Sequence, residues 1–261
     1  MYTNFMKETV ITYDQVFKTY KADIRIKKKA LTGLHFQVQK GEVFGVVGPN
    51  GAGKSTALKI LMGFVRADKG NIDLNGQSPT NPASHKFVGF LPENPCLYEH
   101  LTIIDHLKFC ARVNGYSSQE SVQKIQNLID LVDLSHSATI PIRRFSKGMT
   151  QRAALACALF HEPEILILDE PMSGLDPLGR QLVIEIIREY NKKGHTILFC
   201  SHILTDVERM CDRIGIMCNG KLASIIKPEE LAQNVYSQTT NGEKKTPLES
   251  FFLKTVEEQS L

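Results

Sequence analysis

The sequence predicts an α/β fold with a mainly parallel sheet core, an N-terminal antiparallel β subdomain and an inserted α-helical subdomain. Short apolar runs of strand type alternate with helical patterns both before and after a central helical stretch, and this alternation is typical of a parallel sheet. Two alternating segments near the N-terminus, 9–20 and 34–38, indicate a pair of antiparallel strands. From residue 102 to residue 160 the pattern is helical throughout, which indicates the insertion.

The first part of the chain is expected to hold the antiparallel pair and the start of the parallel sheet. A charged loop containing the basic run 25–29 joins the first two strands. The apolar run Val43–Val47 predicts a buried strand, and a helix is expected from Lys54 to about Phe64. The remaining strands expected here are 70–76, which ends in an Asn-Gly turn, and 87–91.

Three helices are expected in the insertion, and the α/β alternation then resumes. The first helix begins near Leu101, and Ser118-Gln119-Glu120 caps the second, which runs to about Val132. Ser146 caps the third, which runs to Phe160. The elements expected after it are the strand 165–168, the helix 177–193, the strand 196–200, the helix 203–211 and the strand 213–218.

The organisation predicted from these elements is one domain over residues 1–226, with the helical insertion at about 95–162, and a C-terminal helical extension over 227–261. Within the extension, Pro228 starts a short helix and 248–257 form an amphipathic helix. The segment between them, 237–247, is polar and expected to be mobile.

Composition excludes several classes of protein. The chain of 261 residues is 42% hydrophobic and 23% charged, as in ordinary globular proteins, and its formal charge of +3 is too small to indicate nucleic acid. No apolar run approaches the roughly 18 residues that span a membrane, and residues 1–10 lack the apolar stretch of a secretory signal, so we expect a cytoplasmic protein. The six cysteines are scattered without a Cys-x-x-Cys pair, which favours reduced thiols.

A glycine-rich motif follows the predicted strand 43–47 and opens the predicted helix. It fits Gly, four residues, Gly-Lys-Ser/Thr, and its glycines let backbone N–H groups turn toward a phosphate while the helix N-terminus adds its positive dipole end. Lys54 can reach the outer phosphates, and the Ser55 hydroxyl can ligate Mg²⁺. The motif predicts a nucleoside triphosphate site formed by Gly48, Pro49, Asn50, Gly51, Ala52, Gly53, Lys54, Ser55 and Thr56.

Polar residues follow two later strands of the predicted sheet. Asp169 and Glu170 end the apolar run 165–168, at the strand end where ligands bind in open α/β sheets. Asp169 is placed to hold Mg²⁺, and Glu170 can polarise a water for in-line attack on the γ-phosphate. His202 follows a neighbouring strand, where its ring can hydrogen-bond the γ-phosphate.

The order of these motifs resembles the nucleotide-binding domain of ATP-binding cassette (ABC) transporters, a family with the P-loop NTPase fold. The resemblance covers about residues 8–225. It is carried by the phosphate loop, the helical insertion, the segment Arg144–Arg152, the run Leu168–Pro171, the turn Ser173–Asp176, and Ser201-His202.

This resemblance implies that two such domains close head to tail around two molecules of ATP with Mg²⁺. Each site is then built from the phosphate loop of one subunit and Ser146–Gly148 of the other, so Ser146 and Gly148 are expected to contact phosphate. It also implies that Tyr20 stacks on adenine and that Asp176 belongs to the nucleotide site.

Two departures from the family pattern bear on that implication. The usual signature Leu-Ser-Gly-Gly-Gln is Phe145–Met149 here, so Lys147 adds a charge and Met149 loses an amide. Glu93 takes the place of the family's glutamine; its carboxylate can ligate Mg²⁺ or a water but repels phosphate oxygens.

The resemblance further implies an ATPase subunit that powers a membrane-spanning permease on a separate chain and pairs with a second ATP-binding subunit, on the cytoplasmic face of the membrane. The runs Gly89–Tyr98 and Leu248–Phe252 resemble stand-alone ATPase subunits of bacterial-type exporters, which favours an export or membrane-remodelling system. The alternatives are a soluble ABC ATPase that acts on ribosomes or nucleic acid, and a small P-loop kinase. The kinase explains 48–56 but neither the Ser146 segment nor His202.

Overall fold

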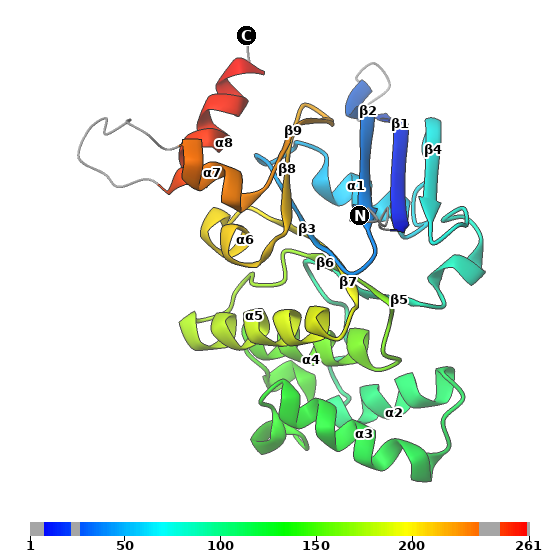
Figure 1. Cartoon of the computed structure of the whole chain (residues 1–261). Helices are drawn as coiled ribbons and strands as arrows, with labels where there is room; N and C mark the ends of the chain where they lie inside the picture. Colours follow the sequence, from blue (N-terminus) through cyan, green and yellow to red (C-terminus); the bar gives the residue numbers. More distant parts are fainter. Residues whose placement is uncertain (1–7, 22–26, 235–245, 260–261) are drawn as a thin grey trace, which may run out of the picture. The chain divides into compact units, whose positions relative to one another are not determined.

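The computed structural model describes residues 8–21, 27–234 and 246–259. The chain divides into two compact units, which we describe separately. The first unit holds the described residues up to His85 and from Leu198 onward, and the second holds Lys86–Ile197. Figure 1 labels the elements of both units.

An antiparallel sheet opens the first unit. Strand β1 (Thr9–Lys21) lies between β2 (Lys27–Gln39) and β4 (Lys69–Leu74) and is antiparallel to both (Figure 1). The predicted antiparallel pair is therefore confirmed. Strand β2 begins earlier than expected, so Lys27–Lys29 lie in a strand and not in a loop, while Arg25 and Ile26 lie outside the described residues.

Aromatic rings form part of the core of this unit. The ring centroid of Phe36 lies 4.6 Å from that of Tyr13 and 5.3 Å from that of Phe44, and both pairs are stacked. The buried Tyr13 hydroxyl donates to the carbonyl of Ala57, at 2.9 Å, and burial raises its pKa well above the usual value. Because Ala57 belongs to helix α1 (Lys54–Leu61), this contact attaches α1 to the antiparallel sheet. The helix ends three residues before the predicted Phe64.

Strand β3 (Val43–Val47) runs parallel to β8 (Arg213–Cys218), which pairs on its other side with β9 (Lys221–Ile226) in antiparallel fashion. The sequence reasoning missed β9. The signal was available, since Asn219 and Gly220 between β8 and β9 have φ of 49° and 79°, as a two-residue hairpin turn requires. The remaining helices of this unit are α6 (Leu204–Met210), α7 (Pro228–Asn234) and α8 (Pro247–Glu258).

The C-terminal helix α8 forms where the amphipathic pattern predicted it. Thr246 and Glu249 make a reciprocal capping box at its start, with distances of 3.2 Å and 2.8 Å between the paired atoms. The helix packs against α6, α7 and β8 within the first unit. Most of the segment expected to be polar and mobile, 237–247, lies outside the described residues.

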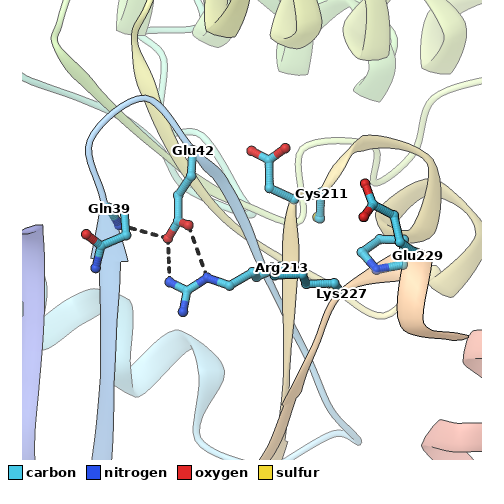
Figure 2. Close-up of a pocket in the computed structure, with 8 residues that line it drawn as sticks. Gln39, Glu42, Cys211, Arg213, Lys227 and Glu229 are labelled. Carbon is cyan, nitrogen blue, oxygen red and sulfur yellow. Dashed lines mark hydrogen bonds and ion pairs between the residues drawn. The ribbon is translucent and has the colours of Figure 1, made fainter. Parts of the chain in front are cut away.

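An ion pair between the buried Glu42 and the partly buried Arg213 holds the turn between β2 and β3 against β8. Figure 2 shows the Glu42 carboxylate accepting hydrogen bonds from the backbone N–H of Gln39 and from the Arg213 guanidinium. The distances are 2.8 Å from Gln39 and 2.7 Å and 3.1 Å from Arg213, and Glu42 is only 4% exposed. The pair borders a cavity of about 480 Å³ whose lining residues are Gln39, Glu42, Cys211, Asp212, Arg213, Lys227, Pro228 and Glu229. None of these is a predicted site residue.

The second unit combines two parallel strands with helices. Strand β5 (Val88–Leu91) is parallel to β6 (Ile165–Asp169), whose five residues are all buried. Helices α2 (Ile103–Val113), α3 (Ser118–Leu131) and α4 (Lys147–Leu159) pack against one another. Helix α5 (Pro177–Lys192) follows β6, and β7 (Thr196–Ser201) begins in this unit and ends in the first.

Two expectations for the helical insertion need correction. Ser117, and not Ser118, caps α3, because its side chain and that of Glu120 form the reciprocal box. The pattern is also not helical throughout, since between α3 and α4 the chain forms the 3₁₀ turns Ser135–Ser137 and Ile142–Arg144 and no α-helix. Asp133 (φ 53°) and Pro141 interrupt helical propagation there.

All six cysteines are free thiols in the structure, and three of them, Cys200, Cys211 and Cys218, are buried. No helix in the described ranges combines the length and the apolar character needed to cross a membrane.

Candidate functional site

The glycines of the phosphate loop are held by close packing within the first unit. A Cβ on Gly48 would lie 2.3 Å from the carbonyl oxygen of Met217, and one on Gly53 would lie 2.5 Å from that of Ala30. Gly53 also has a φ of 109°, which a residue with a Cβ rarely adopts. Gly51 has a φ of 83°, but no described atom lies within 4 Å of a Cβ built there. Packing thus requires glycine at Gly48 and Gly53, and backbone conformation favours glycine at Gly51 and Gly53.

The N-terminus of α1 presents backbone N–H groups at this loop. Its N-cap is Gly53, and no side chain among the described residues caps the helix. The Lys54 ammonium donates to the carbonyls of Gly48, at 2.7 Å, and Pro49, at 3.3 Å, and the residue is 8% exposed. An uncapped helix start with a lysine ammonium over the same loop is an arrangement that binds anions, phosphate in particular.

The turn between β8 and β9 holds the phosphate loop through backbone hydrogen bonds. The N–H of Gly220 donates to the carbonyl of Ala52, at 2.9 Å, and its own carbonyl accepts from the N–H of Thr32, at 2.8 Å. A Cβ on Gly220 would lie 2.7 Å from the carbonyl oxygen of Ala30. Gly220 therefore positions the phosphate loop, and the sequence reasoning missed it together with β9.

Two further predicted residues belong to the first unit. Tyr20 lies near the end of β1 and is partly exposed, with the Lys18 ammonium 5.6 Å from its ring centroid. His202 directly follows β7 and is exposed, while the preceding Ser201 is buried and accepts a hydrogen bond from the N–H of Ile203, at 3.1 Å. Both rings are accessible from solvent, as a residue that contacts a diffusible ligand must be.

Asp169 and Glu170 occupy the end of β6 in the second unit. Asp169 is 7% exposed and Glu170 is 8% exposed, so two adjacent carboxylates are buried. Glu170 has a φ of 51°, a strained conformation for a residue with a side chain. Its carbonyl accepts from the N–H of Ser173, at 3.0 Å, and from the Gln151 side chain, at 3.5 Å. The backbone of Glu170 is therefore fixed by α4 and by the following turn.

The Ser146 segment lies against the turn that follows Glu170. The Ser146 hydroxyl accepts from the N–H of Met149, at 3.1 Å, which confirms it as the N-cap of α4. A Cβ on Gly148 would lie 3.2 Å from the carbonyl oxygen of Gly174, and Lys147 donates to the Ser173 hydroxyl, at 3.1 Å. The structure thus brings Lys147 and Gly148, the two residues that follow Ser146, beside residues 173–175.

Asp176 and Glu93 have different surroundings in the same unit. The exposed Asp176 caps α5, and its carboxylate accepts from the N–H of Gly179, at 2.7 Å. Glu93 lies two residues after β5 and is exposed. Over the ranges that the structure describes, no group of three or more His, Cys, Asp or Glu side chains is arranged to hold a metal ion.

Comparison with known proteins places this geometry in one family. The family model described as ABC transporter matches residues 31–173. An ABC transporter ATP-binding protein of Synechocystis is 38% identical over 98% of this chain and 74% of its own length. The Nod factor export ATP-binding protein I of Burkholderia thailandensis is 36% identical over 88% of this chain and 74% of its own length.

A solved structure gives the same result. The ATP-binding subunit of an ABC transporter superimposes with a TM-score of 0.77 at 32% sequence identity, covering 86% of this chain and 92% of that one. This similarity confirms the predicted fold class. The structure itself contains the predicted antiparallel β subdomain and the helices of the insertion.

Proposed function

The chain belongs to the ATP-binding proteins of ABC transporters, and from this premise we propose which of its residues bind and cleave ATP. As a member of that family it is an ATP-hydrolysing transporter subunit, which works with a membrane-spanning permease on a separate chain and with a second ATP-binding subunit. The arrangement of the phosphate loop is the observation that carries the proposal, since the uncapped start of α1 and the Lys54 ammonium both offer positive charge and N–H donors at this loop.

Within the first unit, residues 48–56 hold the phosphates and Lys54 exchanges the carbonyls of Gly48 and Pro49 for phosphate oxygens. The ammonium then neutralises charge that accumulates on the phosphates during cleavage. Tyr20 stacks on the adenine ring, and His202 hydrogen-bonds the γ-phosphate. Both assignments agree with the exposure of the two side chains.

Within the second unit, Glu170 orients and polarises the water that attacks the γ-phosphate. Its backbone is held by Gln151 and Ser173, which limits the positions that the carboxylate can take. Ser146 and Gly148 contact the γ-phosphate bound by the other subunit, because an N-cap hydroxyl and the N–H groups of a helix start suit an anion. Asp176 completes the nucleotide site from the turn beside them.

The buried Asp169–Glu170 carboxylates fit a divalent cation, because two adjacent buried acids are stabilised by positive charge. In the second unit the Asp169 and Glu93 carboxylates would be Mg²⁺ ligands, and in the first unit the Ser55 hydroxyl is the candidate ligand. The cation would offset the negative charge of the phosphates. Glu93→Gln is expected to change the Mg²⁺ concentration that hydrolysis requires. An unchanged Mg²⁺ titration would show that Glu93 lies outside the metal's surroundings.

Export is the direction of transport that we assign, which the Nod factor export relative supports. A subunit of this kind lies on the cytoplasmic face of the membrane through its permease. Fractionation tests this placement, since the chain should sediment with membranes when its permease is present. Sedimentation with ribosomes would instead favour the ribosomal alternative.

The decisive test of the phosphate site compares two lysines of α1. Lys54→Ala should lower ATP hydrolysis at least tenfold, because the ammonium that contacts the phosphates is lost. Lys59→Ala, an exposed position on the same helix, should leave hydrolysis within twofold of the unchanged protein. Equal activity of the two variants would remove Lys54 from its assigned role.

A further inference from the structure

A single carboxylate holds the end of β1 that carries Tyr20. Asp68, which directly precedes β4, has one oxygen 2.8 Å from the Lys18 ammonium, and its other oxygen accepts from the backbone N–H of Thr19, at 2.7 Å. The N–H of Asp68 donates to the carbonyl of Phe17, at 2.8 Å. Asp68 therefore contacts the three consecutive residues of β1 that directly precede Tyr20.

The Lys18 side chain connects this carboxylate to the Tyr20 ring. The Lys18 ammonium lies 5.6 Å from the ring centroid, within the range of a cation–π interaction. Only 15% of the Lys18 side chain is exposed, so its position is restricted by packing as well as by Asp68. The hydrogen bond from Lys18 lowers the pKa of Asp68, so this carboxylate is charged at neutral pH. Asp68 thus fixes the ammonium, and the ammonium in turn restrains the ring.

The same part of β1 faces an irregularity of β2 within the first unit. Between Lys18 and Thr19 the register of β1 with β2 skips Ala30. An extra residue of this kind bends a strand and changes the direction of nearby side chains. The carbonyl oxygen of Ala30 lies against the phosphate loop, 2.5 Å from where a Cβ on Gly53 would stand. The restrained end of β1 is therefore attached to the phosphate loop through Ala30.

We propose that Lys18, held by Asp68, is a positioning residue for nucleotide binding, which fixes the Tyr20 ring for stacking on adenine. This role rests on the function proposed above for Tyr20. A ring that is already held in its stacking orientation loses less conformational entropy when the base binds, so the affinity for the nucleotide rises. Because Lys18 acts through the ring, its contribution should appear only for ligands that carry the base.

Two ligands that share a diphosphate group test this role in the full chain. ADP carries adenine and pyrophosphate does not, and both should bind the phosphate loop in the presence of Mg²⁺. Calorimetric titration should show that Lys18→Met and Asp68→Asn each raise the Kd of ADP about threefold, as expected for the loss of one cation–π contact, and leave the Kd of pyrophosphate unchanged. Lys18→Arg retains a cation and should bind ADP as the unchanged protein does. Equal weakening of both ligands would show that Lys18 only supports the fold, which would overturn the proposal.

A double substitution distinguishes the role of Lys18 from adenine stacking itself. Tyr20→Ala alone should raise the Kd of ADP about tenfold, and adding Lys18→Met to it should cause no further change. Lys40→Met removes an exposed lysine paired with Glu8 beside the same sheet, and this matched control should bind both ligands normally. A further loss in the double variant, or an unchanged Kd of ADP for Lys18→Met, would overturn the role of Lys18 alone. An unchanged Kd of ADP for Tyr20→Ala would overturn the stacking assignment as well.

Discussion

At the scale of single residues, the phosphate loop shows which glycines the fold requires and for what reason. Gly53 combines a φ of 109° with a backbone oxygen 2.5 Å from where a Cβ would stand, whereas Gly51 has a φ of 83° and open space. The motif predicts both glycines equally, and the packing of Ala30 and Leu31 of β2 and of Met217 of β8 around Gly53 distinguishes them. Substitutions at the two positions therefore should not have equal effects.

Gly53→Ala should lower the free energy of unfolding by about 1–3 kcal/mol, because the strained φ and the contact with Ala30 act together. The displaced loop should also bind ATP at least tenfold more weakly. Gly51→Ala introduces only the strain of a positive φ, so it should lower the free energy of unfolding by about 1 kcal/mol. Urea unfolding and nucleotide titration measure both quantities. A larger loss for Gly51→Ala would show that open space around Gly51 does not persist in solution.

At the scale of elements, the start of α4 has two tasks that the same atoms perform. The Ser146 hydroxyl caps the helix, and we propose that it also contacts phosphate. Ser146→Ala should cost about 1 kcal/mol of stability, as the loss of a cap does. Ser146→Asp keeps a capping oxygen but places a negative charge where the phosphate binds. It should therefore retain stability and lower hydrolysis at least tenfold.

The residue that caps α2, Thr102, provides the control for the two Ser146 variants. Thr102 accepts a hydrogen bond from the N–H of Asp105 and has no assigned contact with nucleotide. Thr102→Ala should lose a similar amount of stability, about 1 kcal/mol, and keep its hydrolysis rate per folded molecule. If Ser146→Asp hydrolysed ATP as fast as this variant, Ser146 would be a cap and nothing more.

The Glu42–Arg213 ion pair also acts at the scale of elements, because it joins the turn after β2 to β8. Glu42→Ala leaves the partly buried Arg213 guanidinium without its carboxylate and the N–H of Gln39 without its acceptor. The free energy of unfolding should fall by about 3 kcal/mol. Glu189→Ala removes the exposed partner of Lys192 and should leave stability nearly unchanged. Chemical denaturation of the two variants under one set of conditions gives the comparison.

Elements are also where sequence reasoning succeeded and failed for identifiable reasons. Strands β3 and β6 were predictable because every residue in them is buried and apolar, apart from the terminal Asp169. The cap of α3 was misplaced by one residue because Ser117 and Ser118 are adjacent, and only the reciprocal bond to Glu120 selects between them. The β8–β9 hairpin was missed although its Asn219-Gly220 turn is a strong local signal.

The candidate site was predictable where all the residues that form its binding geometry lie in one short stretch of the chain. The phosphate loop needs only a strand, glycines and a helix, which are contiguous in the chain. The role of Gly220 was not accessible in that way, since it supports Ala52 from 168 positions away through a backbone hydrogen bond. The contact of Gly148 with Gly174 likewise depends on tertiary packing, which periodicity does not encode.

At the scale of the whole molecule, the proposed mechanism requires that two copies of the chain, or this chain and a related one, close on ATP and separate after its cleavage. Glu170 is the residue whose loss should stop the cycle between these steps, because hydrolysis needs its carboxylate and nucleotide binding does not. Glu170→Gln preserves the size of the side chain and removes its charge.

Glu170→Gln is therefore expected to bind ATP, to hydrolyse it at least 100-fold more slowly, and to accumulate as an ATP-bound dimer. Size-exclusion chromatography with light scattering, in excess ATP, measures the dimer, and phosphate release measures turnover. Glu164→Gln, an exposed position beside the other end of β6, is the matched control and should remain active and mainly monomeric. Rapid turnover by Glu170→Gln would remove Glu170 from its role. Slow turnover without a dimer would instead contradict closure of two subunits around ATP.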